Sequence, residues 1–372
     1  MKRIKKDFYN QLCEIPMMDV HTHLDADHPV ARGLSDILLY HMVISDLVSA
    51  GCPSRNRLPE FPSQEETSSR IEEAISYLPY IQNTAMFWGV RTILRDLYQW
   101  EEPITLNNWR ELDSRIASQA QKPSWGTEIA QRANIRRAST ELWRRHAGNM
   151  DHFLQYSLEW AFFTRSQWGI NDITLIELER AWNQPGPSAP LPVMMGKERP
   201  QLDRNIQTID DVHSAIQYYV EHIPFQQIIS TAQHISTDIH YRVVDSSEMA
   251  RAIKLRRQAT TNERDIYACY ILEAFLSELE KTAQGIVYHF SIGAEPLPFE
   301  TGSKLNPETI FELAAIIERH PSLRFQALLS SEHSNQALCT LARELPNLSL
   351  AGYWWHNFFP GTIQKIMQER LD

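Results

Sequence analysis

The sequence predicts an α/β protein built as a (β/α)8 TIM-type barrel with a helix-rich insertion after the first strand. Three observations predict this fold. A short apolar run near the N-terminus ends in two histidines, a long helix-patterned region follows it, and short strand-like runs then alternate with amphipathic stretches. Such alternation is typical of parallel β/α units. We therefore assign residues 1–33 and 131–372 to a metal-dependent barrel domain and residues 34–130 to a helical insertion.

The first strand is predicted at residues 14–21, and the stretch MMDVHTHLDA places His21 and His23 one residue apart. In a strand, residues i and i+2 project to the same side, so Asp19, His21 and His23 are expected to project together. Imidazole nitrogens with an open coordination position suit zinc, and manganese is the alternative. We predict that His21 and His23 bind one divalent ion. The competing interpretation of an isolated pair is that the two histidines are polar residues of the surface or core that bind no metal.

The insertion is predicted to be helical because its apolar residues recur at helical spacing. Ser35 and Asp36 are candidate caps for the first helix, and Gly51 is its candidate end. The predicted helices of the insertion cover residues 34–51, 63–81, 81–99 and 107–120. Two further helices are predicted at 151–167 and 172–182, with a loop at 184–192.

Six more strand-like runs follow. They are residues 135–140, 191–196, 225–232, 285–293, 323–330 and 348–355, with helices at 263–281 and 306–320 between the later ones. Together with the first strand they make seven, whereas a closed barrel of this type has eight. Residues 356–372 look like a loop and a helix. We therefore expect this sequence to be a truncated form whose natural continuation adds an eighth strand ending in an aspartate.

Composition limits the classes of function. The 372 residues are 43% hydrophobic and 22% charged, which is globular, and the net charge of −10 argues against a nucleic-acid partner. No apolar run reaches the roughly 18 residues of a membrane span, and the basic N-terminus leads into no signal-peptide core. Four widely spaced cysteines fit reduced thiols in a cytoplasmic protein.

In a barrel of this kind, the active site lies at the carboxyl ends of the strands. Histidines recur at those positions: His234 and His240 at or after the fourth strand, and His289 in the fifth. We predict catalytic roles for His234 and His289, although each also fits a hydrogen-bonded core histidine. The histidines expected to be structural are His28, His146, His152, His213, His222, His320 and His333.

Three further residues at strand ends are predicted to bind substrate. Arg242 follows the fourth strand, and Trp354 and Trp355 end the seventh. Arg242 also fits a solvated loop charge. Since Trp354 and Trp355 are adjacent on a strand, at least one of them is expected to pack against helices.

DVHTHL resembles the first-strand metal motif of the amidohydrolase superfamily. Within it, the sequence resembles the uronate (glucuronate) isomerase family. That family also has a helix-rich insertion after its first strand, a segment similar to HMVISDLVSAG, an IGA triplet matching Ile292–Ala294, and a Gly-x-Trp-Trp element matching Gly352–Trp355.

The resemblance implies specific roles and also shows departures. It implies that His21 and His23 are metal ligands and that His41 is the histidine of a catalytic motif, whose tyrosine position here holds Met42. The family's Gln-x-His before IGA is here His289-Phe290-Ser291, and its third ligand, an aspartate ending strand eight, has no counterpart. The implied reaction interconverts an aldose and a ketose form of a uronic acid, such as glucuronate and fructuronate, at one divalent metal ion.

Two other functions stay open. One is a metal-dependent hydrolase of a lactone, ester or amide. The stretch IISTAQHISTD at the end of strand four has no lysine or glutamate for a second metal, which favours one ion. The other is an inactive sugar-acid-binding scaffold. In each case the expected partner is a small-molecule sugar acid, and homo-oligomerisation is left open.

Overall fold

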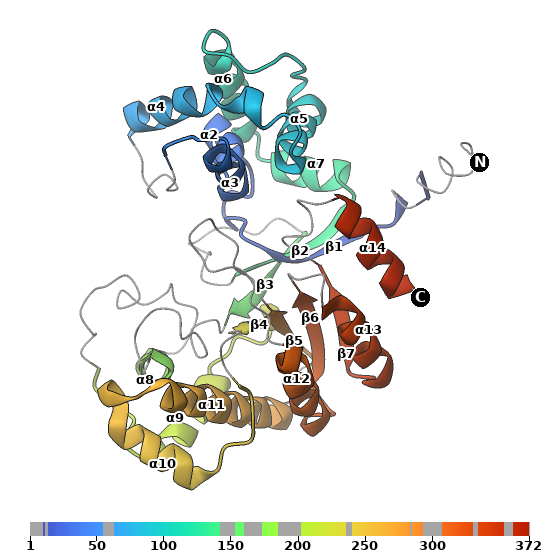
Figure 1. Ribbon diagram of the computed structural model, residues 1–372. Helices are drawn as coiled ribbons and strands as arrows, with labels where there is room; N and C mark the ends of the chain where they lie inside the picture. The colour runs from blue at the N-terminus through green and yellow to red at the C-terminus, as the bar shows by residue number, and fades with distance from the viewer. Residues whose placement is uncertain are drawn as a thin grey trace.

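The centre of the molecule is one sheet of seven parallel strands in the order β1 to β7, curved so that it nearly closes into a barrel (Figure 1). The computed structural model describes residues 10–11, 14–54, 63–141, 153–159, 173–184, 202–235, 240–282, 285–292, 307–329, 334–352 and 360–371. The strands are β1 Met17–Thr22, β2 Ile135–Glu141, β3 Leu154–Glu159, β4 Ile228–Ile235, β5 Val287–Ile292, β6 Arg324–Leu329 and β7 Leu348–Ala351. The predicted α/β barrel with seven strands is confirmed.

One strand was assigned wrongly from the sequence. β3, Leu154–Glu159, lies inside the stretch 151–167 that was predicted to be a helix. Leu154, Tyr156 and Leu158 alternate into the buried core, which is the period of a strand. The stretch LQYSLE therefore carried a strand signal, but it spans only six residues of the longer stretch 151–167. The run at 191–196, predicted as the third strand, lies outside the described residues.

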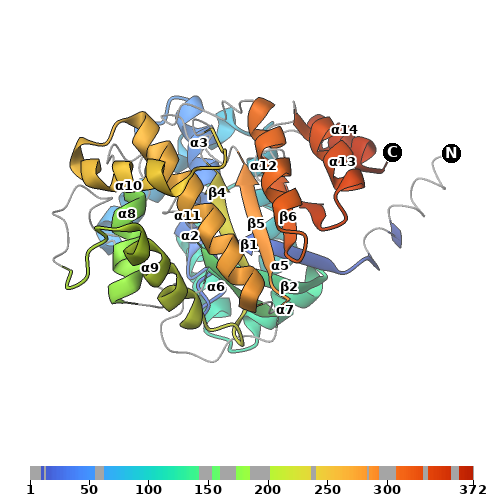
Figure 2. The ribbon, with the colours of Figure 1, turned by 90° about the horizontal axis from the view of Figure 1, so that it is seen from below.

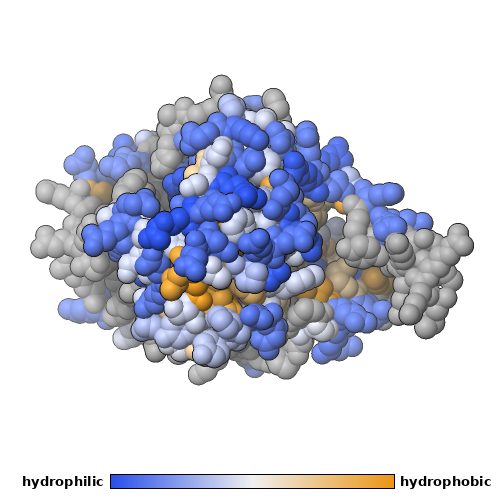
Figure 3. Space-filling model, turned by 90° about the horizontal axis from the view of Figure 1, so that it is seen from above, coloured by the Kyte–Doolittle hydropathy of each residue, from blue (hydrophilic) through white to orange (hydrophobic). Residues whose placement is uncertain are grey.

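The insertion is a layer of helices on one side of the sheet, at the top of Figure 1. Its helices are α2 Leu34–Leu38, α3 His41–Ser49, α4 Gln64–Ile75, α5 Ala85–Tyr98, α6 Trp109–Ala120 and α7 Trp125–Arg132, with the 3-10 turn η1 Leu78–Tyr80. These helices bury their own apolar cluster, with Trp109 and Leu112 near its centre. The outer surface of this layer is largely hydrophilic (Figure 3).

The single helix predicted at 34–51 is in fact two. Tyr40 has an extended backbone (φ −63°, ψ 138°), so the chain turns between α2 and α3 and a new helix begins at His41. Gly51 follows α3 with φ +99°, a conformation that glycine adopts readily. The break therefore places His41 in the first turn of a helix.

The remaining helices cover the outside of the barrel (Figures 1 and 2). They are α8 Ile173–Asn183, α9 Ile209–Glu221, α10 Ser246–Leu255, α11 Thr261–Thr282, α12 Pro307–Arg319, α13 Asn335–Glu344 and α14 Pro360–Leu371, with the 3-10 turn η4 Arg256–Gln258. In Figure 2, α11 crosses the sheet near β4 and β5. Within the described ranges, no helix has both the length and the hydropathy that crossing a bilayer requires.

A charged cluster joins α11 to the end of α12. His320 is almost fully buried and lies 3.2 Å from Glu273 through Nε2 and 3.0 Å from Glu280 through Nδ1. Burial alone would lower the pKa of His320, but the hydrogen bonds and charges of the two glutamates outweigh it and raise that pKa. Burial opposes ionisation of Glu273 as well, yet His320 and Arg319 together lower its pKa to about 2. Because His320 precedes β6, this cluster lies at the amino end of the strands, the end of a barrel associated with stability.

The stability of the protein should therefore depend on pH through His320. Its pKa is raised, so its contribution is complete below the unfolded value of 6.5 and is lost as the pH rises through the folded value. We expect His320→Gln to lower the free energy of unfolding by about 1–3 kcal/mol at pH 6, with a smaller loss at pH 8.5. Urea unfolding at both pH values measures this. His222→Gln, which alters an exposed ring bonded to the Tyr218 carbonyl, is the control, and equal losses for His320→Gln at the two pH values would contradict the assignment.

Candidate active site

Two imidazoles converge at the carboxyl end of β1. His21 lies in the strand and His23 directly follows it, and their Nε2 atoms are 3.0 Å apart. The rings meet edge to face, with centroids 5.0 Å apart and planes at 77°. Two histidine nitrogens bound to one zinc ion at about 2.0–2.1 Å are themselves roughly 3.0–3.4 Å apart. The pair therefore has the geometry and the donor chemistry to hold one divalent ion.

Asp19 adds a carboxyl group beside this pair. Its Oδ1 accepts a hydrogen bond from the His21 backbone N–H at 3.3 Å. Burial raises the pKa of Asp19 to about 6, and this hydrogen bond opposes the rise. When Asp19 is ionised, its negative charge favours a cation nearby.

The insertion contributes a third imidazole. His41, the first residue of α3, is buried, and its ring is nearly parallel to that of His23, with centroids 6.5 Å apart. The ring of Tyr40 packs against His41 at 4.3 Å. The structure thus brings His21 and His23 at the end of β1 close to His41 of the insertion. The catalytic role of His41 stays a prediction.

His289 is held inside the barrel by the alternation of β5. Tyr288 and Phe290 pack into the aromatic cluster between the sheet and α11, where Phe275 and Phe325 contact Tyr288. His289 and its neighbour Ser291 therefore face the interior of the barrel. Burial lowers the pKa of His289 to about 4, so the ring is neutral near pH 7 and has one nitrogen free of a proton.

The remaining predicted site residues are His234, Arg242, Trp354 and Trp355. His234 pairs in register with Ser291, two residues beyond His289 toward the carboxyl end of the sheet. Arg242 donates two hydrogen bonds to Glu248, at 3.0 and 2.9 Å, and Glu248 belongs to the capping box that begins α10. Its substrate role stays a prediction. Trp354 and Trp355 lie outside the described residues.

Sequence analysis missed a group of buried hydroxyls on neighbouring strands. Ser157 pairs in register with Ser230, and Ser230 pairs with Val287, which places both serines on the same face of the sheet as His289. Ser139 of β2 joins them through the β2–β3 register. Among the described residues, the three hydroxyl oxygens have no hydrogen-bond partner. The signal in the sequence is one serine in each of three successive strands, β2, β3 and β4. These hydroxyls give the barrel interior hydrogen-bonding capacity for a hydroxylated ligand.

Comparison with solved structures places this fold beside sugar-acid isomerases. The uronate isomerase from Thermotoga maritima superposes with a TM-score of 0.68 at 13% identity, covering 98% of this chain and 81% of that one. The glucuronate isomerase from Caulobacter crescentus gives 0.68 at 14% identity, covering 96% and 78%. The uronate isomerase from Bacillus halodurans gives 0.63 at 15% identity, covering 100% and 80%. No protein-family model and no curated protein matches the sequence. At these identities, the property shared with the three isomerases is the fold.

Proposed function

We propose that this protein is a metal-dependent isomerase that interconverts the aldose and ketose forms of a uronic acid, of the glucuronate and fructuronate type. The observation that carries the proposal is the convergence of the His21 and His23 Nε2 atoms, 3.0 Å apart, at the carboxyl end of β1. The fold likeness to three sugar-acid isomerases supports it. Zinc is the proposed ion and manganese the alternative, because both accept imidazole ligands.

The reaction moves a proton between C1 and C2 of the sugar and builds negative charge on an oxygen. A divalent ion held by His21 and His23 supplies Lewis-acid polarisation of the carbonyl and neighbouring hydroxyl oxygens. His41, whose ring lies near that of His23, is the proposed base that accepts and returns the proton, and a positioned base contributes about 10²–10⁴-fold to the rate. His289 is neutral and can accept a hydrogen bond from a sugar hydroxyl.

The remaining parts of the proposal concern substrate selection and location. Arg242 recognises the uronate carboxylate through a bidentate pair, in place of Glu248. Trp354 and Trp355 are the further proposed substrate-binding residues, and His234 is a proposed catalytic residue. Cys52, Cys269 and Cys339 are free thiols, which supports a cytoplasmic location. We retain the division into a barrel domain, 1–33 and 131–372, and an insertion, 34–130.

A substrate panel tests the proposal. The purified protein, loaded with zinc or manganese, is incubated with glucuronate and galacturonate, and the ketose product is measured by NMR. We expect turnover of at least one uronate and none of glucose, because glucose lacks the carboxylate. Simple lactones and amides form the second arm. Turnover confined to them would establish the hydrolase instead, and uronate binding without any turnover would establish the scaffold.

A further inference from the structure

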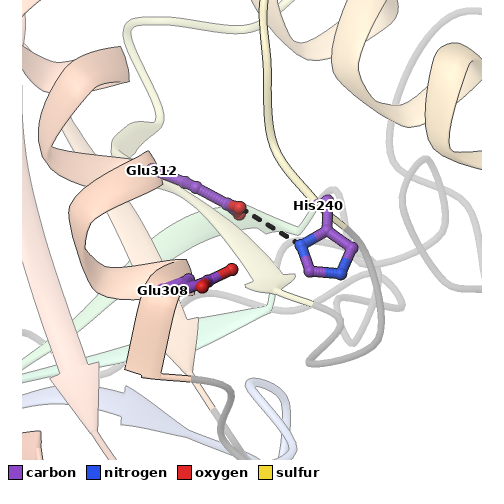
Figure 4. A group of neighbouring side chains, drawn as sticks. All are labelled: His240, Glu308 and Glu312. Carbon is purple, nitrogen blue, oxygen red and sulfur yellow. Dashed lines mark hydrogen bonds and ion pairs between the residues drawn. The ribbon is translucent and has the colours of Figure 1, made fainter.

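A second group of metal-binding side chains lies away from β1. His240 is in the segment between β4 and α10, and Glu308 and Glu312 are in the first turns of α12, the helix after β5. One potential ligand atom from each lies within 4.8 Å of the others. Figure 4 shows both glutamates on the side of α12 that faces His240. Side chains from two separate segments thus converge on one point.

The contacts around this group fix its geometry. Glu312 accepts the backbone N–H of Tyr241 at 2.8 Å through one oxygen, and its other oxygen lies 3.3 Å from His240 Nδ1. Tyr241 is buried, and the Cys269 thiol donates to the carbonyl oxygen of His240 at 3.3 Å. The backbone beneath the imidazole is therefore held from α11 and α12 at once. Such supporting hydrogen bonds orient metal ligands in established sites.

We propose that His240, Glu308 and Glu312 bind a divalent transition-metal ion that joins the segment after β4 to α12. One imidazole nitrogen and two carboxylates suit zinc or manganese, whereas calcium and magnesium prefer oxygen ligands alone. The helix dipole favours Glu308 near the start of α12, but two carboxylates this close repel each other, and a bound cation removes that repulsion. The exposed positions of His240 and Glu308 leave room for water to complete the coordination.

This site is separate from the pair on β1. β2 and β3 lie between β1 and β4 in the sheet, and neither His21 nor His23 belongs to the second group. The two sites can therefore be removed independently. Loss of metal binding at one site would leave the proposal for the other site unaffected.

Zinc binding by the full chain tests this proposal in a background without the first site. We expect the double variant His21→Asn/His23→Asn to bind about one zinc ion per chain in equilibrium dialysis, and zinc to raise its melting temperature. Adding His240→Ala or Glu308→Gln should weaken this binding at least about tenfold, since each removes one ligand. His222→Ala on the same background is the matched control, because His222 is exposed and its ring contacts Tyr218 of its own helix.

Two outcomes would overturn the second site. One is a double variant that stays folded by circular dichroism but binds no zinc at 100 µM. The other is equal zinc affinity in the His240→Ala and His222→Ala variants. A calcium arm checks the ligand chemistry: calcium binding as tight as zinc binding would contradict a site that depends on an imidazole.

Discussion

Replacing His21 and His23 together with asparagine should lower kcat/KM for the uronate by at least about 10³-fold, because the reaction loses the cation that stabilises its developing oxyanion. The same variant should bind one metal ion fewer per chain than the wild type. Both effects are expected because the two Nε2 atoms lie 3.0 Å apart, close enough to bind the same ion. Metal analysis and steady-state kinetics on the same preparation measure the two effects together.

The control for this variant is His213→Asn. His213 is an exposed histidine whose Nε2 lies 2.9 Å from the Tyr270 hydroxyl, and its loss should leave both metal content and kcat/KM unchanged. A folded His21→Asn/His23→Asn variant with wild-type metal content would refute the metal assignment. Normal activity of this variant with one ion fewer would instead show that the reaction does not require the ion.

The largest effect on stability is expected at Arg256. Its guanidinium donates to both oxygens of Glu179, at 2.6 and 2.9 Å, and to the Ile206 carbonyl at 2.7 Å. The Glu179 side chain is only 4% exposed. Arg256→Ala leaves this carboxylate buried without its counter-charge, so we expect the free energy of unfolding to fall by about 3–5 kcal/mol. Chemical unfolding followed by circular dichroism measures it.

A matched surface pair separates burial from pairing. Arg95 makes the same two-pronged contact with Asp96, at 2.6 and 3.0 Å, but both side chains are exposed. Arg95→Ala should therefore destabilise the protein far less than Arg256→Ala. The double variant Glu179→Met/Arg256→Met should recover much of the loss, because no unpaired charge remains. Equal effects of the two arginine substitutions would show that burial of Glu179 is not the cause.

Local patterns predicted most of the sheet and the projection of His21 and His23 to one side of the end of β1. β1 and its histidines follow from a strand period of two, which needs no knowledge of distant residues. β3 was missed although LQYSLE alternates apolar and polar residues, because this six-residue signal lies inside a longer stretch that was assigned as one helix. The break at Tyr40 was missed because the apolar residues on both sides keep one helical spacing across it.

The convergence of distant residues could not be predicted in the same way. Nothing in the spacing of residues places α3 over the end of β1, so the position of His41 came from a family resemblance alone. Glu308 and Glu312 look like ordinary acids at the start of a helix. Their closeness to His240 depends on how α12 packs beside the segment between β4 and α10, and the spacing of residues in the sequence does not determine that packing.

The position of β1 has a thermodynamic consequence. Among the described residues β1 pairs with β2 alone, its register is interrupted twice, and Met17 and Met18 are exposed, so local opening of this strand breaks the pairing with one neighbouring strand and not with two. Opening frees the backbone that holds the His21 and His23 rings in position, so an ion that requires both imidazoles would bind the closed strand more tightly. Metal at a hundred times its dissociation constant then opposes opening by about 2.7 kcal/mol. Metal occupancy and the amide-exchange protection of this edge would therefore form one linked equilibrium, in which the proposed ion also stabilises the pairing of β1 with β2.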